Sequence, residues 1–164
     1  GTASFAINEP GVGKKVSFDS DGDGYLAGKL GIGVTAPTHP IQLTSGAHVT
    51  IGGVWTNASD KNLKENFDEV NGESLLEKIG SLDISQWNYK NESDDIKHIG
   101  PTAQDFYKAF GVGGDDKTIS TVDPSGIALA AIKELYKKSK EVDELKKQLD
   151  ELTKVVEKLA KERK

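Results

Sequence analysis

Residues 135–159 read LYKKSKEVDELKKQLDELTKVVEKL, and the spacing of their apolar side chains decides the fold of the C-terminal part of this chain. These side chains recur in heptads, with Leu135, Val142, Leu149 and Val156 at position a and Leu145, Leu152 and Leu159 at position d. Consecutive heptads of this kind predict a coiled coil. We therefore expect residues 127–164 to form one long helix, capped by Asp123 or Ser125, that buries its a/d seam against copies of itself.

The number of helices in this coiled coil is left open by the heptads. Valine at a with leucine at d favours two strands. Thr153, Val155 and Ala160 at positions e and g widen the apolar face, which favours three or more. Lys138 falls at position d, so the seam should weaken towards the preceding region. The alternative is a helix that packs on its own domain.

Residues 59–126 have the pattern of a small mixed α/β domain. Apolar spacing predicts helices over residues 62–80 and 99–111, the second closed by a glycine. Alternation predicts a strand over residues 83–90, and a second short strand is expected over residues 119–122.

Residues 1–58 hold 11 of the 18 glycines and alternate short β-branched stretches with turns. Strands are expected within residues 3–7, 16–18, 30–34, 41–43 and 48–51. Such short, glycine-rich strands cannot build a good core alone, and hydrophobic residues are only 35% of the chain, a share low for a compact domain. The sequence thus predicts an α+β chain whose first 58 residues end a β-rich stalk wound from several copies. The start at Gly1 and Thr2, without a methionine, indicates a piece cut from a longer protein.

Composition excludes several classes of function. Residues 1–132 carry 10 Lys and Arg against 18 Asp and Glu, an acidic balance unsuited to nucleic acid. No apolar run is long enough to span a membrane, and the absence of cysteine excludes disulfides and thiolate zinc sites. Asp19 to Gly24 resemble the start of a calcium loop, but Leu30 stands where the loop needs glutamate, so a polar turn is expected. We expect no metal and no cofactor.

Ser59, Asp60, Lys61 and Lys64 place a hydroxyl, a carboxylate and two ammonium groups within six residues. A serine paired with a lysine is a minimal combination of nucleophile and base. A serine followed by an aspartate is also an ordinary helix cap, and both roles can coincide.

Three blocks of sequence carry a family resemblance. The first is GVWTNASDKNLKEN at residues 53–66, the second HIGPTAQD at residues 98–105, and the third VDPSGI at residues 122–127, running into AAIKEL at residues 130–135. In this order they resemble the C-terminal intramolecular chaperone auto-processing domain of phage tailspikes, tail fibres and neck appendages. The resemblance covers about residues 50–160.

The resemblance implies a mechanism and a setting. Three chains would associate through the chaperone domain and the coiled coil, align the stalk strands, and then cut themselves between Ser59 and Asp60. Ser59 and Lys64 match the catalytic dyad of the family. His98 matches the neighbourhood of a histidine that supports cleavage in the family. The stalk would belong to a virion, and the chaperone part would be released in the host cytoplasm. The alternative is an oligomerisation module of a fibre or adhesin that does not cut.

Overall fold

The computed structural model describes residues 6–9, 13–18, 21 and 23–162, and the chain divides into two compact units, Gly1–Phe67 and Asp68–Lys164. Each unit is described by itself. Together they contain small β-sheets and a long C-terminal helix, so the predicted α+β class is confirmed. The predicted domains 1–58, 59–126 and 127–164 stay predictions.

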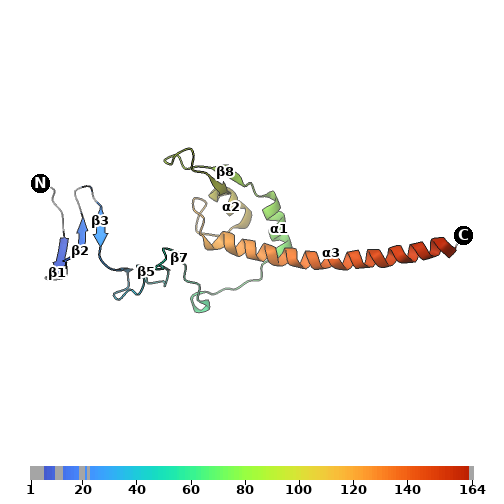
Figure 1. Ribbon diagram of the computed structural model, residues 1–164, viewed down its shortest axis with the longest axis horizontal. Coiled ribbons are helices and arrows are strands. Elements are labelled where there is room, and N and C mark those ends of the chain that lie inside the picture. Colours follow the sequence, from blue (N-terminus) through green and yellow to red (C-terminus); the bar gives the residue numbers. More distant parts are fainter. Residues whose placement is uncertain (1–5, 10–12, 19–20, 22, 163–164) are drawn as a thin grey trace. The chain divides into compact units, whose positions relative to one another are not determined.

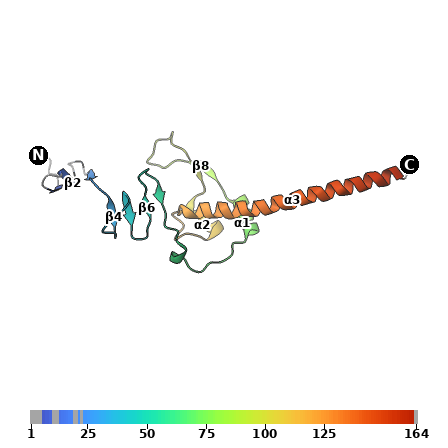
Figure 2. The ribbon, with the colours of Figure 1, turned by 60° about the horizontal axis from the view of Figure 1, so that its bottom comes forward.

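The first unit contains two small sheets (Figures 1 and 2). The first sheet is antiparallel, with the order β1 (Ala6–Glu9), β2 (Gly13–Phe18) and β3 (Gly24–Leu26). In the second sheet β4 (Leu30–Ile32) pairs in parallel with β5 (Ile41–Leu43), and β6 (His48–Val49) and β7 (Trp55–Thr56) follow antiparallel.

The parallel pair is closed by the short loop over residues 33–40. The N–H of Leu30 donates to the carbonyl oxygen of Pro40 at 2.8 Å, and that of Thr44 donates to the carbonyl oxygen of Ile32 at 3.1 Å. Gly33 has φ 71°, and a Cβ there would collide with the hydroxyl of Thr44. The loop therefore requires glycine at this position.

Strands were predicted correctly near residues 16–18, 30–34, 41–43 and 48–51, whereas β3 and β7 were missed. Residues 3–5 of the first predicted strand and part of the polar turn at 19–24 lie outside the described residues. Among the described residues of this unit, Ala47 is the one classed as buried, and Ile32 is 55% exposed. The sheets thus leave apolar faces uncovered, as a stalk of several chains would require; the stalk itself stays a prediction.

In the second unit the first short helix packs against both the long C-terminal helix and the second short helix, and a two-stranded sheet completes the unit. Its elements are α1 (Gly72–Ser81), β8 (Ser85–Trp87), β9 (His98–Gly100), α2 (Ala103–Phe110) and α3 (Val122–Glu162). The side chains of Asn71 and Thr102 cap α1 and α2, and Gly111 ends α2 in the left-handed conformation with φ 64°. Polar N-caps and a left-handed glycine are the standard signals for helix ends.

The core of this unit is small. Leu75 of α1, Phe106 of α2 and Ala131 of α3 are its buried apolar side chains among the described residues. Gly72 lies so close to the side chain of Glu134 that a Cβ would come within 2.6 Å of it. This close approach sets where α1 meets α3.

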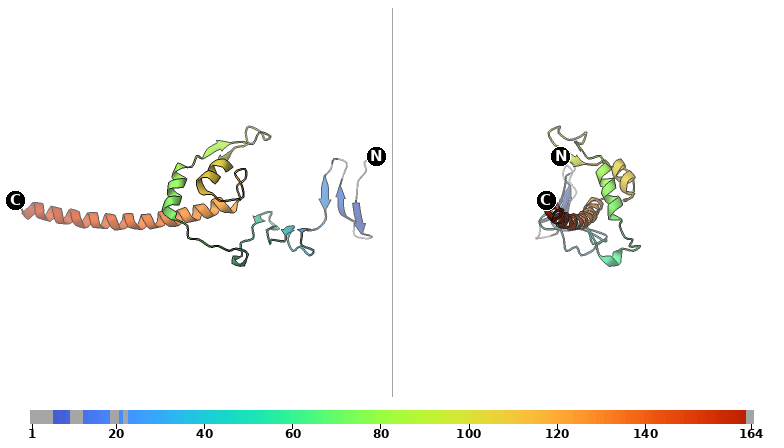
Figure 3. Two further views of the ribbon diagram at one scale, coloured as in Figure 1. Left: turned by 180° about the vertical axis from the view of Figure 1, so that it is seen from behind. Right: turned by 90° about the vertical axis from the view of Figure 1, so that its right-hand side faces the viewer.

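The predicted long helix is confirmed, although it begins at Val122 rather than at residue 127, so Asp123 and Ser125 lie inside its first turn. Beyond α1 it continues free of the rest of its unit (Figure 3), and every described residue from position 139 onward is exposed. Val142 is 47% exposed and Leu149 63%. The helix does not pack its heptad seam on its own domain, which is compatible with a coiled coil; the number of copies stays a prediction.

Lys138, the charged residue at position d, has a partner that the heptads could not indicate. Its Nζ lies 3.1 Å from Oε1 of Glu73 on α1, and this hydrogen bond is the main cause that raises the pKa of Lys138. The seam is therefore interrupted at the level where α1 reaches α3.

Two predicted elements were wrong. The helix expected over residues 62–80 is a 3₁₀ turn at Lys61–Leu63, an extended stretch, and then α1. Asn66 has φ 53°, a left-handed conformation that a continuing helix does not allow. The strand expected over residues 119–122 is absent, because residues 119 and 120 form no regular structure, Thr121 is in a turn and Val122 begins α3. The N–H of Asp123 bonds the carbonyl oxygen of Ser120 at this entry to the helix.

Candidate functional site

The Ser-Asp-Lys segment folds into one tight turn. Asp60 caps the 3₁₀ turn Lys61–Leu63, and its Oδ1 accepts hydrogen bonds from the backbone N–H of Asn62 at 2.9 Å and from the Asn62 side-chain amide at 3.0 Å. The N–H of Lys64 then bonds the carbonyl oxygen of Lys61 at 3.1 Å. The cap and the candidate site therefore coincide, with Asp60 taking the capping role and leaving Ser59 free for another contact.

This turn brings Lys64 back onto Ser59. Lys64 Nζ donates a hydrogen bond to Ser59 Oγ at 2.7 Å, across five positions of sequence. Among the described residues Lys64 forms no ion pair, although Asp60 and Glu65 are close in sequence. A neutral amine at the same distance would accept the Ser59 proton, so the pair has the geometry of nucleophile and base.

The pair is exposed in the single chain, as are all residues from Asn57 to Val70. Trp55 upstream is 46% exposed, and its indole N–H donates to Asn57 Oδ1 at 2.9 Å, so it is not a core tryptophan. Water can therefore reach the Ser59–Asp60 peptide bond. A lysine acts as a base only in its neutral form, which burial favours.

His98, the third predicted site residue, belongs to the second unit, whereas Ser59 and Lys64 belong to the first. It pairs across the β8–β9 ladder with Trp87, and the two ring centroids lie 4.9 Å apart. Its Nε2 lies 3.0 Å from Oε2 of Glu92, and both side chains are about one-third exposed. The structure thus brings Ser59 and Lys64 together and gives His98 a carboxylate partner.

Glu92 was missed by sequence reasoning. It lies in the polar turn over residues 89–95, between the two strands, where no fixed spacing links it to His98. A carboxylate on one imidazole nitrogen orients the ring, which is the arrangement of a base held by a third group.

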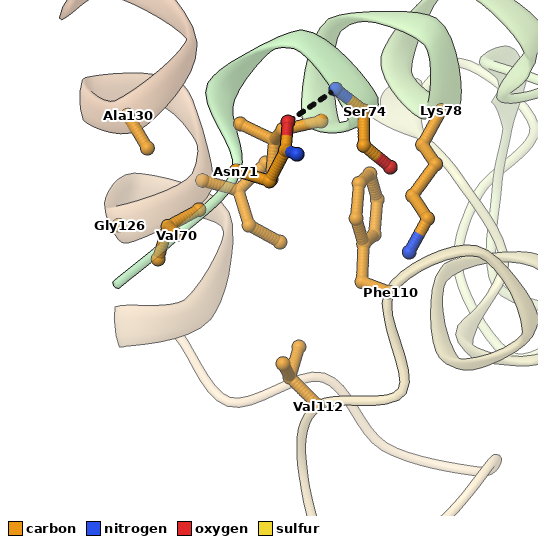
Figure 4. Close-up of a pocket in the computed structure, with 10 residues that line it drawn as sticks. Val70, Asn71, Ser74, Lys78, Phe110, Val112, Gly126 and Ala130 are labelled. Carbon is orange, nitrogen blue, oxygen red and sulfur yellow. Dashed lines mark hydrogen bonds between the residues drawn. The ribbon is translucent and has the colours of Figure 1, made fainter. Parts of the chain in front are cut away.

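A pocket of about 310 Å³ lies elsewhere in the second unit (Figure 4). Its walls come from α1 and the residues just before it, from the C-terminal end of α2 and the residues after it, and from the start of α3, and they include Leu75, Phe110, Val112 and Ile127. Lys78 is the charged side chain of this lining, and the predicted site residues are not part of it. The pocket therefore has no set of converging polar groups that would suit catalysis.

The groups whose pKa values are shifted belong to the second unit, whereas Ser59 belongs to the first. Asp115 has a lowered pKa because its carboxylate accepts the backbone N–H groups of Lys117 and Thr118 and the Thr118 hydroxyl. Lys137 has a raised pKa because its ammonium bonds Glu134 at 2.7 Å. These groups stabilise a turn and a helix, respectively.

The described residues hold no group of three or more histidine, aspartate or glutamate side chains placed to bind a metal ion. Within the same part of the chain, none of the helices combines the length and apolar character needed to cross a bilayer.

The fold and the site define a class of protein: an α+β module with an uncovered amphipathic helix and a Ser–Lys pair beside an exposed peptide bond. Residues 59–114 match the family described as "Chaperone of endosialidase" (Peptidase_S74), which is the family that the sequence blocks predicted. This is the family of C-terminal intramolecular chaperone domains of phage tail proteins, and its name classes it with peptidases. Neither the comparison with curated proteins nor that with solved structures returned a match.

The match supports a role for this chain as a chaperone of a phage tail protein, one that associates with tail fibre proteins and with other copies in the setting of a virion.

Proposed function

We propose that this chain ends a β-rich fibre stalk with an intramolecular chaperone that forms a homotrimer, sets the register of the stalk strands, and then releases itself by cutting the Ser59–Asp60 bond. The observation that carries the proposal is the 2.7 Å contact between Lys64 Nζ and Ser59 Oγ, directly beside that bond. The uncovered heptad seam of α3 supports association of several copies.

The cleavage is a hydrolysis. The oxygen of water adds to the Ser59 carbonyl carbon, the bond to the Asp60 nitrogen breaks, and the products are a carboxylate on Ser59 and an amine on Asp60. The Ser59 hydroxyl is a poor attacker of its own carbonyl, because that step would close a strained four-membered ring. Attack on the preceding carbonyl would break Ala58–Ser59 instead. The attacking group is therefore a water activated by the dyad, or a hydroxyl of another chain, whose ester with Ser59 is then hydrolysed by water to the same two products.

Association of copies would supply the burial that the dyad lacks in a single chain. Once Lys64 leaves bulk water, its neutral amine is favoured and can take a proton from the attacking group. This would couple the cut to assembly. Loss of the chaperone after assembly would leave the stalk kinetically locked, since the part that guided its folding is gone.

His98 has a supporting role in this proposal. The Glu92 carboxylate orients its imidazole, which could then donate or accept a proton during cleavage. The contact between His98 and the reacting group of the assembled site is part of the proposal.

The test is denaturing electrophoresis and mass spectrometry of freshly expressed protein. Wild type should give two fragments, one ending at Ser59 and one beginning at Asp60. Ser59→Ala and Lys64→Ala should stay uncut while still assembling, and Lys61→Ala is the matched control because Lys61 lies in the same turn without a contact to Ser59. Normal cutting by the Lys64 variant would refute the dyad.

The competing function is an oligomerisation module of a fibre or adhesin without catalysis. The uncovered seam of α3 supports it equally well, because a coiled coil alone can register a fibre. It predicts a single intact band for wild type together with a sedimentation mass of several chains.

A further inference from the structure

The first half of α3 carries a second apolar stripe that is separate from the heptad seam. Leu129, Ile132 and Tyr136 are spaced three and four residues apart, so they lie on one face of the helix. They are 69%, 60% and 62% exposed, which is as much as the seam residues of the free half. This flank, defined here by these three residues, has no cover within its own unit.

The heptad register places this flank. Continued upstream from position a at Leu135, the register puts Ile132 at e and both Leu129 and Tyr136 at b. Ile127 and Glu134 fall at g, on the opposite side of the seam. The e/b flank and the g side are thus the two shoulders of the helix next to the a/d line.

The g shoulder is already occupied by the same chain. Glu134 packs against Gly72 at the start of α1, and Ile127 lines the pocket with Leu75. Ala131, which the register places at d next to this shoulder, is buried. Figure 4 shows α1 and the start of α3 on two sides of this pocket. Each α3 therefore carries its own α1 on one shoulder and a bare apolar stripe on the other.

In a parallel bundle of identical helices, the e side of one helix faces the g side of the next. The g side here carries α1. We propose that the e/b flank of each copy packs against the α1–α2 region, residues 68–112, of the neighbouring copy. The inference rests on the proposed homotrimer and extends it: the coiled coil alone would hold the tails, whereas this contact would lock each chaperone unit onto the next α3 in a closed ring.

Site-specific photocrosslinking tests the contact directly. A benzophenone amino acid replaces Tyr136 in full-length Ser59→Ala protein, which removes cleavage as a variable, and unlabelled chains are mixed with ¹⁵N-labelled chains before assembly. Mass spectrometry should find mixed-isotope crosslinks from position 136 to residues 68–112. The control places the same probe at Lys133, which lies at position f on the outer side of the helix and should give no crosslink between chains.

The outcomes separate this inference from the proposed function. Sedimentation of the same samples reports whether the copies associate; a monomer would overturn the homotrimer and this contact with it. An oligomer whose crosslinks run to its own chain, to α3 or to residues 1–67 would overturn the contact alone.

A second measurement compares the association constants of variants. Leu129→Gln and Tyr136→Gln keep good helix-forming residues but remove the stripe. Each should weaken association by roughly tenfold per copy, given the area left to bury. Lys133→Gln should leave association unchanged. Equal affinities for all three variants would overturn the proposal even if every variant folds.

Discussion

Truncation of Leu149 to alanine tests whether the seam of α3 holds copies together. Leu149 is 63% exposed in the single chain, and full burial of a leucine side chain contributes about 1.5–3 kcal/mol. About 1–2 kcal/mol per copy is therefore left to gain on association, and alanine loses most of it. Over three copies the loss is about 3–5 kcal/mol, which lowers the association constant roughly a hundred-fold to several thousand-fold.

The assay is sedimentation equilibrium over a wide range of concentration, with Ser59→Ala in both proteins to prevent cleavage. Lys154→Ala is the control, because it makes the same change to alanine at the outward position f of the same heptad. The dissociation midpoint of the Leu149 variant should move to higher concentration, and that of the control should not. Identical midpoints, or a wild type that stays monomeric throughout, would refute the use of this seam.

Three further results are expected. Gly72→Ala should destabilise the second unit by about 1–2 kcal/mol in urea unfolding, because overpacking against Glu134 outweighs the gain in helix propensity. Gly80→Ala in the same helix meets no neighbour and should stabilise the unit. Equal effects of the two substitutions would contradict the close approach of Gly72 to Glu134. The pKa of Asp115 is lowered, so the carboxylate should stabilise the protein at pH above the usual aspartate pKa, and this stabilisation should vanish as the pH falls through the lowered pKa. The free energies of unfolding of wild type and Asp115→Asn, compared across acid pH, check this expectation. A difference between them that does not change with pH would refute it. On the proposed mechanism, Glu92→Gln should slow the appearance of the Asp60-terminated fragment several-fold without changing the sedimentation mass, and an unchanged time course would remove the pair with His98 from the reaction.

Sequence reasoning succeeded where the structure is local and periodic. The heptads predicted the long helix, and the three sequence blocks predicted the family that matches residues 59–114. Ser59 and Lys64 were paired from the sequence motif and the family resemblance, and the structure places their side chains in contact, whereas their catalytic role stays a prediction.

The failures occurred where two patterns overlap. Residues 62–70 carry a helix-like stripe, but left-handed Asn66 and the cap at Asn71 divide it, so α1 begins only at Gly72. The local preference of asparagine for turns and caps outweighed a weak periodicity.

The heptads are enough to predict that α3 is a long amphipathic helix, because such a repeat follows from short-range spacing along the backbone. The contact between Ser59 and Lys64 depends on the turn at Lys61–Leu63, a segment that the sequence had assigned to a longer helix. Only the tertiary structure decided which side of α3 is covered, that Glu73 is the partner of Lys138, and that Glu92 is the partner of His98. These contacts join segments that meet only when the chain packs, and no repeat or fixed spacing in the sequence predicts them.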